Sequence, residues 1–325
     1  MRLKTAFIII LVFSLSGFRL SVAQQQSQCL AVITGLNGDV LIKKLHKTEF
    51  VKASWGTQLF QGDQIRTSIN SEATLTLSNS SFIRLGSNSM ITISGNETIA
   101  TEKSGNVREI SSAAMIDLSA LTLKRDTKPE SGALAGLRSD NTEKTIELTS
   151  PYNTLIKTNR PSFSWTANKS FDNYIVNLYN SKGLVWKKKV SDSVMDYPES
   201  EKDLEFGESY FWNVDGEGLI ENEKSGNFKF SVLSNEKSKE VAAQEIIIKS
   251  TLKDEAETSS LHSVLGAYYI NQGLLQDAIN EFQIISKINV DAPLPHEILG
   301  SLYSDVGNKD KAIEELQKAL ELSKK

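Results

Sequence analysis

The chain has 325 residues, of which 39% are hydrophobic and 23% charged, and this length is expected to form two or three domains. Its formal net charge is −4, so nothing in the overall balance predicts binding to nucleic acid. Cys29 is the only cysteine, which excludes an internal disulfide.

The N-terminus has the pattern of an export signal. Two basic residues precede an apolar run at residues 6–15, and residues 21–23 read SVA, a small-x-small cleavage pattern. The apolar run is shorter than a membrane span requires. We therefore expect a signal peptide at residues 1–23, cleavage after Ala23, and no stable membrane span after processing. The alternative is an N-terminal anchor that is retained.

The next block, residues 30–125, is predicted to be an all-β domain. Apolar and polar side chains alternate with a period of two at residues 73–77, 82–85 and 90–93. Turn-forming residues separate these short stretches. Short, closely spaced strands of this kind are typical of a roll, barrel or sandwich.

The same block carries a family resemblance. The residues concerned are GDV at 38–40, WG at 55–56, GDQIRT at 62–67, ATL at 73–75 and IRL at 83–85. On these residues the block resembles the FecR-like domain, a family of extracytoplasmic bacterial β domains. The resemblance implies a periplasmic, extracellular or cell-surface location in a bacterium, and an envelope ligand for the domain. The cytoplasmic segment of the founding branch has no match, so its sigma-factor role is not expected here.

Residues 126–146 mix charged residues with glycines and predict a linker. A second β block follows at residues 147–233, with about seven short strands expected from the alternation and turn signals. Its residues 204–214 read LEFGESYFWNV. This run resembles the corner of fibronectin type III and immunoglobulin-like sandwiches, where a tyrosine hydroxyl bonds to the backbone upstream. The lack of a cysteine pair favours the fibronectin branch.

The remaining residues, 237–325, are predicted to be helical. A first helix places Val241, Ile248 and Leu252 on one stripe. After it the sequence repeats with an offset of 34 residues. The identical pairs are His262/His296, Leu265/Leu299, Gly266/Gly300, Tyr269/Tyr303, Gly273/Gly307, Ala278/Ala312, Ile279/Ile313, Glu281/Glu315 and Gln283/Gln317. A period of this length predicts stacked helical hairpins that share one core.

The order Leu-Gly-x-x-Tyr, then Gly, then Ala resembles the tetratricopeptide repeat (TPR), with repeats at residues 259–292 and 293–325. Gly273 and Gly307 stand where the first helix of each pair must end, a position that favours a left-handed residue. The expected fold class is therefore multidomain β plus α. It combines an N-terminal FecR-like β domain, a central immunoglobulin- or fibronectin-like sandwich and C-terminal TPR hairpins.

No catalytic, cofactor or metal pattern is found in the sequence. His262 and His296 occupy equivalent repeat positions, which favours a packing role over metal binding. No phosphate-binding loop, nucleophile elbow or zinc-protease helix is present. We therefore expect a protein that is not an enzyme and that needs no cofactor.

The repeats indicate the function. In this repeat type the first helix of each pair lines a groove that binds a protein partner. The candidate contacts are Ser263, Asn271, Glu297, Ser301 and Asp305. We expect a non-enzymatic exported binding or scaffold protein of the bacterial envelope. One alternative is a FecR-type envelope sensor or signal-transduction regulator, and another is a cell-wall or carbohydrate-binding module.

Overall fold

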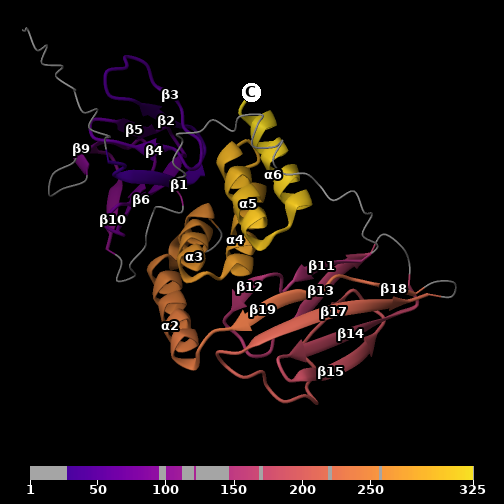
Figure 1. Ribbon diagram of the computed structural model, residues 1–325. Coiled ribbons are helices and arrows are strands. Elements are labelled where there is room, and N and C mark those ends of the chain that lie inside the picture. The colour runs from indigo at the N-terminus through magenta and orange to yellow at the C-terminus, as the bar shows by residue number, and fades with distance from the viewer. Residues whose placement is uncertain are drawn as a thin grey trace, which may run out of the picture.

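The computed structural model describes residues 28–94, 100–111, 121, 146–167, 171–218, 222–255 and 258–324. The predicted signal peptide, its cleavage site after Ala23 and nearly all of the predicted linker 126–146 lie outside these residues. The described part is β plus α (Figure 1). It comprises an N-terminal β region (residues 28–111), a sandwich (residues 146–233) and a helical block (residues 235–324).

Two antiparallel five-stranded sheets form the N-terminal β region. The first sheet has the order β10 (Val107–Ile110), β7 (Phe82–Leu85), β6 (Glu72–Leu77), β1 (Ala31–Asn37), β4 (Gln58–Leu59). The second has the order β3 (Val51–Lys52), β2 (Val40–Lys43), β5 (Gln64–Thr67), β8 (Met90–Ile93), β9 (Ala100–Ser104).

Side-chain alternation along these strands builds one core. Ile33, Leu75 and Ile83 from the first sheet pack in the same hydrophobic cluster as Ile65 and Ile91 from the second, and all five are fully buried. Successive residues of a strand point to opposite faces, so every second side chain reaches this core. The strands predicted from the alternation are confirmed as β6, β7 and β8.

The sandwich has a three-stranded and a six-stranded sheet. The smaller sheet has the order β11 (Ile146–Ser150), β13 (Phe163–Ala167), β16 (Val194–Met195). The larger has the order β12 (Thr154–Ile156), β19 (Phe228–Val232), β17 (Ser209–Glu217), β14 (Asn173–Asn180), β15 (Gly183–Val190), with β18 (Asn222–Lys224) paired to β17.

Aromatic side chains fill the space between the two sheets. The Phe163 ring makes edge contacts with Trp186, Trp212 and Phe230, at centroid distances of 5.5, 5.0 and 6.1 Å. The corner predicted before β17 is present, because the Glu205 N–H donates to the hydroxyl of Tyr210 at 2.9 Å. This bond ties the incoming loop to the strand that follows it.

The helical block follows the sandwich directly. Its elements are α2 (Asn235–Thr251), the short 3-10 helix η2 (Lys253–Glu255), α3 (Ser259–Gln272), α4 (Leu275–Ile288), α5 (Pro293–Val306) and α6 (Lys309–Leu322). The predicted stripe of α2 is confirmed, since Val241, Ile248 and Leu252 are buried. No helix within the described ranges is long and apolar enough to cross a membrane.

The helices α3 and α4 form one hairpin, and α5 and α6 form a second. Gly273 and Gly307 end α3 and α5 with φ angles of 72° and 88°, in the left-handed conformation that their positions predict. Gly266 allows the two helices of the first hairpin to approach closely, because an added Cβ would lie 2.8 Å from the Phe282 ring. The 34-residue period thus corresponds to one helical hairpin.

The helical block lies between the other two parts of the molecule (Figure 1). On one side α3 contacts β1 of the N-terminal β region, and on the other α4 contacts β12 of the sandwich. These two contacts cover part of the first hairpin and so determine which surfaces of the hairpins remain accessible to solvent.

Candidate functional site

The five predicted contact residues lie in different environments. Ser263 is fully buried, Glu297 is half-buried, and Asn271, Ser301 and Asp305 are exposed. Ser263 and Glu297 occupy equivalent positions of the two hairpins, as do Asn271 and Asp305. On the surface expected to run along both hairpins, the position of Ser263 is therefore covered in the first hairpin, whereas its equivalent Glu297 is partly open in the second; Asn271 and Asp305 are exposed in both.

Trp55 of the N-terminal β region covers Ser263. Its indole Nε1–H lies 3.1 Å from Ser263 Oγ and 3.1 Å from the Thr34 carbonyl oxygen. Its ring packs edge-on against Phe282 of α4 at 6.4 Å. Ser259 adds a bond from its hydroxyl to the same Thr34 carbonyl at 2.9 Å. Ser263 therefore belongs to an internal contact, in contrast to the accessible position that we expected from the sequence.

The open surface is a polar stripe on α5, here called the α5 stripe. It comprises Glu297, Ser301 and Asp305, which are four residues apart and so share one helix face. Within the described part of the chain, neither Glu297 nor Asp305 takes part in the ion pairs of the second hairpin. The stripe thus presents two carboxylates that form no ion pair with a cation of the described residues.

A cluster around Lys157 joins the sandwich to the helices. The Lys157 ammonium lies 2.6 Å from Glu245 of α2 and 3.1 Å from Asp277 of α4, and it donates to the Tyr269 hydroxyl at 3.0 Å. Burial by itself would lower the pKa of Lys157. The Asp277 charge and the bonds to Glu245 and Tyr269 outweigh burial and raise that pKa, so the lysine stays charged at neutral pH.

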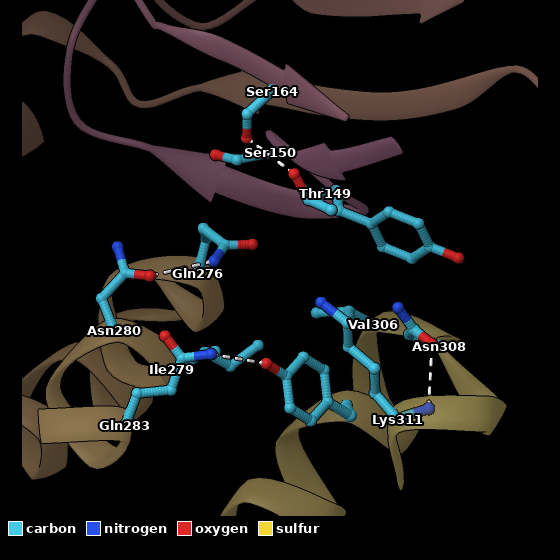
Figure 2. Close-up of a pocket in the computed structure, with 12 residues that line it drawn as sticks. Thr149, Ser150, Ser164, Gln276, Ile279, Asn280, Gln283, Val306, Asn308 and Lys311 are labelled. Atoms are coloured by element: carbon cyan, nitrogen blue, oxygen red, sulfur yellow. Dashed lines mark hydrogen bonds between the residues drawn. The ribbon is translucent and has the colours of Figure 1, made fainter. Parts of the chain in front are cut away.

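A cavity of about 360 Å³ lies between the sandwich and the helices α4, α5 and α6 (Figure 2). This volume is near the lower end of the range for small-ligand pockets, roughly 300–1,000 Å³. The lining residues are Thr149, Ser150, Tyr152, Ser164, Gln276, Ile279, Asn280, Gln283, Tyr303, Val306, Asn308 and Lys311. We call this space the junction cavity.

Carboxamides from α4 form one wall of the junction cavity. Gln276, Asn280 and Gln283 project from one face of the helix, as Figure 2 shows. Gln276 Nε2 donates to Asn280 Oδ1 at 3.1 Å, and Gln283 Nε2 donates to the Tyr303 hydroxyl at 2.8 Å. Each amide has more donors and acceptors than these bonds use, so the wall can bond to a ligand as well.

Hydroxyl groups of the sandwich form the opposite wall. Thr149 and Ser164 share a hydrogen bond of 2.7 Å on neighbouring strands β11 and β13 (Figure 2). The hydroxyl of Tyr152 stays protonated at neutral pH, because burial, assisted by Glu147 and Asp310, raises its pKa to about 12. This wall therefore offers neutral groups that can both donate and accept.

Among the described residues that line the junction cavity, Lys311 supplies the one charge. Its side chain extends from α6 into the space, and its ammonium lies 5.4 Å from the centroid of the Tyr303 ring (Figure 2). The part of the lining that the structure describes contains no Asp, Glu, His or Cys. Over the described residues, no group of three or more such side chains is placed to hold a metal ion. The chemistry of this cavity is therefore hydrogen bonding and charge attraction.

The sequence pattern does not predict the contacts of Trp55 with α3 or of Lys157 with α2 and α4. Contacts between distant segments produce no periodicity in the sequence. A signal for the cavity does exist in the repeat. At the 34-residue offset, Gln276 and Asn280 correspond to Asp310 and Glu314, so amides replace acids where α4 faces the cavity. This replacement can be interpreted only once the structure shows what α4 and α6 each face.

No family model and no curated protein matches the sequence. Among solved structures, one that is similar is an α-L-rhamnosidase from Dictyoglumus thermophilum, at 26% identity, a TM-score of 0.25, and coverage of 31% of this chain and 14% of that one. Another is a segment of two fibronectin type III domains from chicken tenascin, at 8% identity, a TM-score of 0.17, and coverage of 62% of this chain and 91% of that one. The chain thus spans about a seventh of the rhamnosidase, and its likeness to fibronectin type III domains is weak.

Proposed function

We propose that this protein is a non-enzymatic binding or scaffold protein, exported to the periplasm or surface of a bacterium, whose TPR-type hairpins bind a protein partner. Its N-terminal β region is of the FecR-like type and its sandwich of the fibronectin type III type. The support for these assignments is the sequence resemblance together with the hairpin period and the tyrosine corner.

The observation that carries the binding role is the α5 stripe. Trp55 occupies the equivalent surface of the first hairpin, so α5 offers the open part of the groove-lining face. Glu297 and Asp305 lie two helical turns apart on it and have no internal cation among the described residues. A partner segment with basic residues at a matching spacing would complement these charges.

Affinity capture from the native envelope tests the proposal. The bait is the full chain, compared with Glu297→Lys/Asp305→Lys and with the matched reversal Glu236→Lys/Glu240→Lys on the exposed face of α2. We expect a partner that the wild type and the α2 variant retain and the α5 variant loses. Recovery of the same proteins by all three baits would contradict a docking role for the α5 stripe.

The contact of Trp55 with α3 supports a second candidate, a FecR-type envelope sensor. A ligand that bound the N-terminal β region and shifted Trp55 would uncover Ser263 and extend the α5 stripe onto α3. This candidate predicts that Trp55→Ala increases partner capture in the experiment above. Unchanged capture by a folded Trp55→Ala protein would count against the sensor.

A further inference from the structure

The two hairpins differ in charge at equivalent positions. Gln276 and Asn280 of α4 stand where α6 has Asp310 and Glu314, and the two acids on α6 are exposed. Carboxylates on the exposed face of α6 stay hydrated. On α4 the equivalent side chains line the junction cavity, where removing a carboxylate from water would cost free energy. The exchange removes negative charge from the cavity wall while it keeps the hydrogen-bonding capacity.

The opposite exchange occurs one position further along each helix. Asp277 of α4 is neutralised by Lys157, and its equivalent on α6 is Lys311. Lys311 is half-buried and lines the cavity, and within the described residues no carboxylate forms an ion pair with it. A positive charge is therefore placed at a cavity whose lining, among the described residues, carries no acid; the nearby carboxylates of Glu147 and Asp310 act on Tyr152 from outside it.

We propose that the junction cavity binds a small hydroxyl-rich ligand that carries one carboxylate, that is, an acidic saccharide unit such as a uronic acid. The carboxylate accepts a charge-assisted hydrogen bond from Lys311, which is stronger than a neutral one. The sugar hydroxyls, each a donor and an acceptor, bond to the Asn280 and Gln276 amides on one wall and to Thr149 on the other.

The shape and composition of the cavity favour a saccharide over a peptide segment. Ile279 and Val306 are the only aliphatic side chains in the described lining, which offers little apolar surface to anchor an aliphatic peptide side chain. The polar groups lie on two facing walls, with α4 on one side and the strands β11 and β13 of the sandwich on the other (Figure 2). The site uses a different face of α5 from the α5 stripe, so it goes beyond the proposed protein docking.

Titration of the full chain with galacturonate and glucuronate tests the proposal, with galactose and glucose as the uncharged probes. Calorimetry or saturation-transfer NMR gives the affinities. We expect at least one of the acids to bind with a dissociation constant of about 1 mM, and its neutral counterpart to bind about tenfold more weakly, the ratio expected for one charge-assisted bond. Lys311→Gln should abolish this difference, whereas the matched exchange Lys287→Gln, on the exposed face of α4, should preserve it.

A second variant keeps the test decisive if Lys311→Gln is unstable. Asn280→Asp is isosteric at an exposed helix position and places a negative charge on the cavity wall. We expect it to weaken uronate binding at least tenfold, with the circular dichroism spectrum unchanged. The proposal is overturned if neither acid binds, if acidic and neutral sugars bind equally, if Asn280→Asp has no effect, or if a short carboxylate-bearing peptide binds more tightly than the uronates.

Discussion

The two helical hairpins share their internal contacts and differ in what surrounds them. In each, a histidine Nδ1 on the first helix lies 2.6 Å from a glutamate Oε2 on the second: His262 from Glu281, and His296 from Glu315. The surrounding contacts are not shared. The first hairpin is covered by the N-terminal β region and by the sandwich, and the second keeps the α5 stripe open.

One further pair shows how the array begins. Tyr303 of the second hairpin accepts a hydrogen bond from Gln283 on the helix before it, and Tyr269 of the first donates to Glu245 of α2 at 2.8 Å. The helix α2 therefore takes the place that α4 takes for the second hairpin. A short array thus gains a preceding neighbour without a full additional repeat.

The largest difference in stability between the two hairpins is expected from Trp55→Ala. The change removes a fully packed indole and its two hydrogen bonds, and large-to-small changes of this kind cost about 3–5 kcal/mol of unfolding free energy. Urea unfolding should show the loss, and amide exchange should accelerate in α3 and not in α6. Equal acceleration in both hairpins would mean that Trp55 supports the whole array.

A smaller loss is expected from Lys157→Met. It leaves Glu245 and Asp277 half-buried without their cation, at a cost of about 1–3 kcal/mol after allowance for partial exposure. The matched change Lys311→Met removes no ion pair among the described residues and should cost at most about 0.5 kcal/mol. Thermal unfolding of the two variants measures the difference.

The same lysine predicts a loss of stability at alkaline pH. Because folding raises the pKa of Lys157 above its ordinary value, its contribution is complete below about pH 10.4 and is lost as the pH rises through the folded-state pKa. Lys157→Met should remove this part of the alkaline loss. A variant with the same alkaline profile as the wild type would contradict the assignment.

An intermediate effect is expected from alanine at the helix-packing glycines. At Gly266 the added Cβ meets the fully buried Phe282 ring, and we expect a loss of about 1–2 kcal/mol. At Gly300 it meets Leu316, which is half-buried and can move, so the loss should be smaller. Paired urea titrations of the two variants check the order, which would be reversed if α5 and α6 were the more rigid pair.

The smallest effect is expected from Glu315→Gln. Burial acts to raise the pKa of Glu315. The hydrogen bond with His296 and the Lys318 charge outweigh burial, so the pKa of Glu315 is lowered overall. A lowered pKa means that the contribution is present above the unfolded value of about 4.3 and is lost as the pH falls through the folded-state value. The variant should lose less than about 1 kcal/mol at pH 7 and should flatten the acid limb of the stability profile.

The features that could be predicted from the sequence are those that rest on a repeat, on alternation of apolar and polar residues, or on a local turn motif. The strands β6 to β8 follow from period-two alternation, the left-handed ends of α3 and α5 from Gly273 and Gly307, and the corner before β17 from its tyrosine. Such features depend on neighbours in the chain, so local patterns reveal them.

Contacts between distant segments could not be predicted in this way. Ser263 was expected on a free surface, and the structure buries it beneath Trp55, 208 residues earlier in the chain. Equivalent repeat positions have the same local sequence signal whatever covers them. One sequence difference that reflects these neighbours is Gln276, which lines the junction cavity, in place of Asp310 at the equivalent position of the second hairpin. It can be interpreted only once the fold is known.

The central claim is that the N-terminal β region covers Ser263 of α3 and reaches α5 only at its start, at Leu294, so that the α5 stripe stays open. An ideal Cβ at Gly35 of β1 would meet Ser260 Oγ of α3, so these two positions are direct neighbours and form a suitable pair for a cysteine cross-link. In a Cys29→Ser background, mild oxidation of Gly35→Cys/Ser260→Cys should give a faster-migrating monomer on a non-reducing gel, and Gly35→Cys/Ser301→Cys should not. Absence of the cross-link in the first pair, or equal cross-linking in both, would contradict the account.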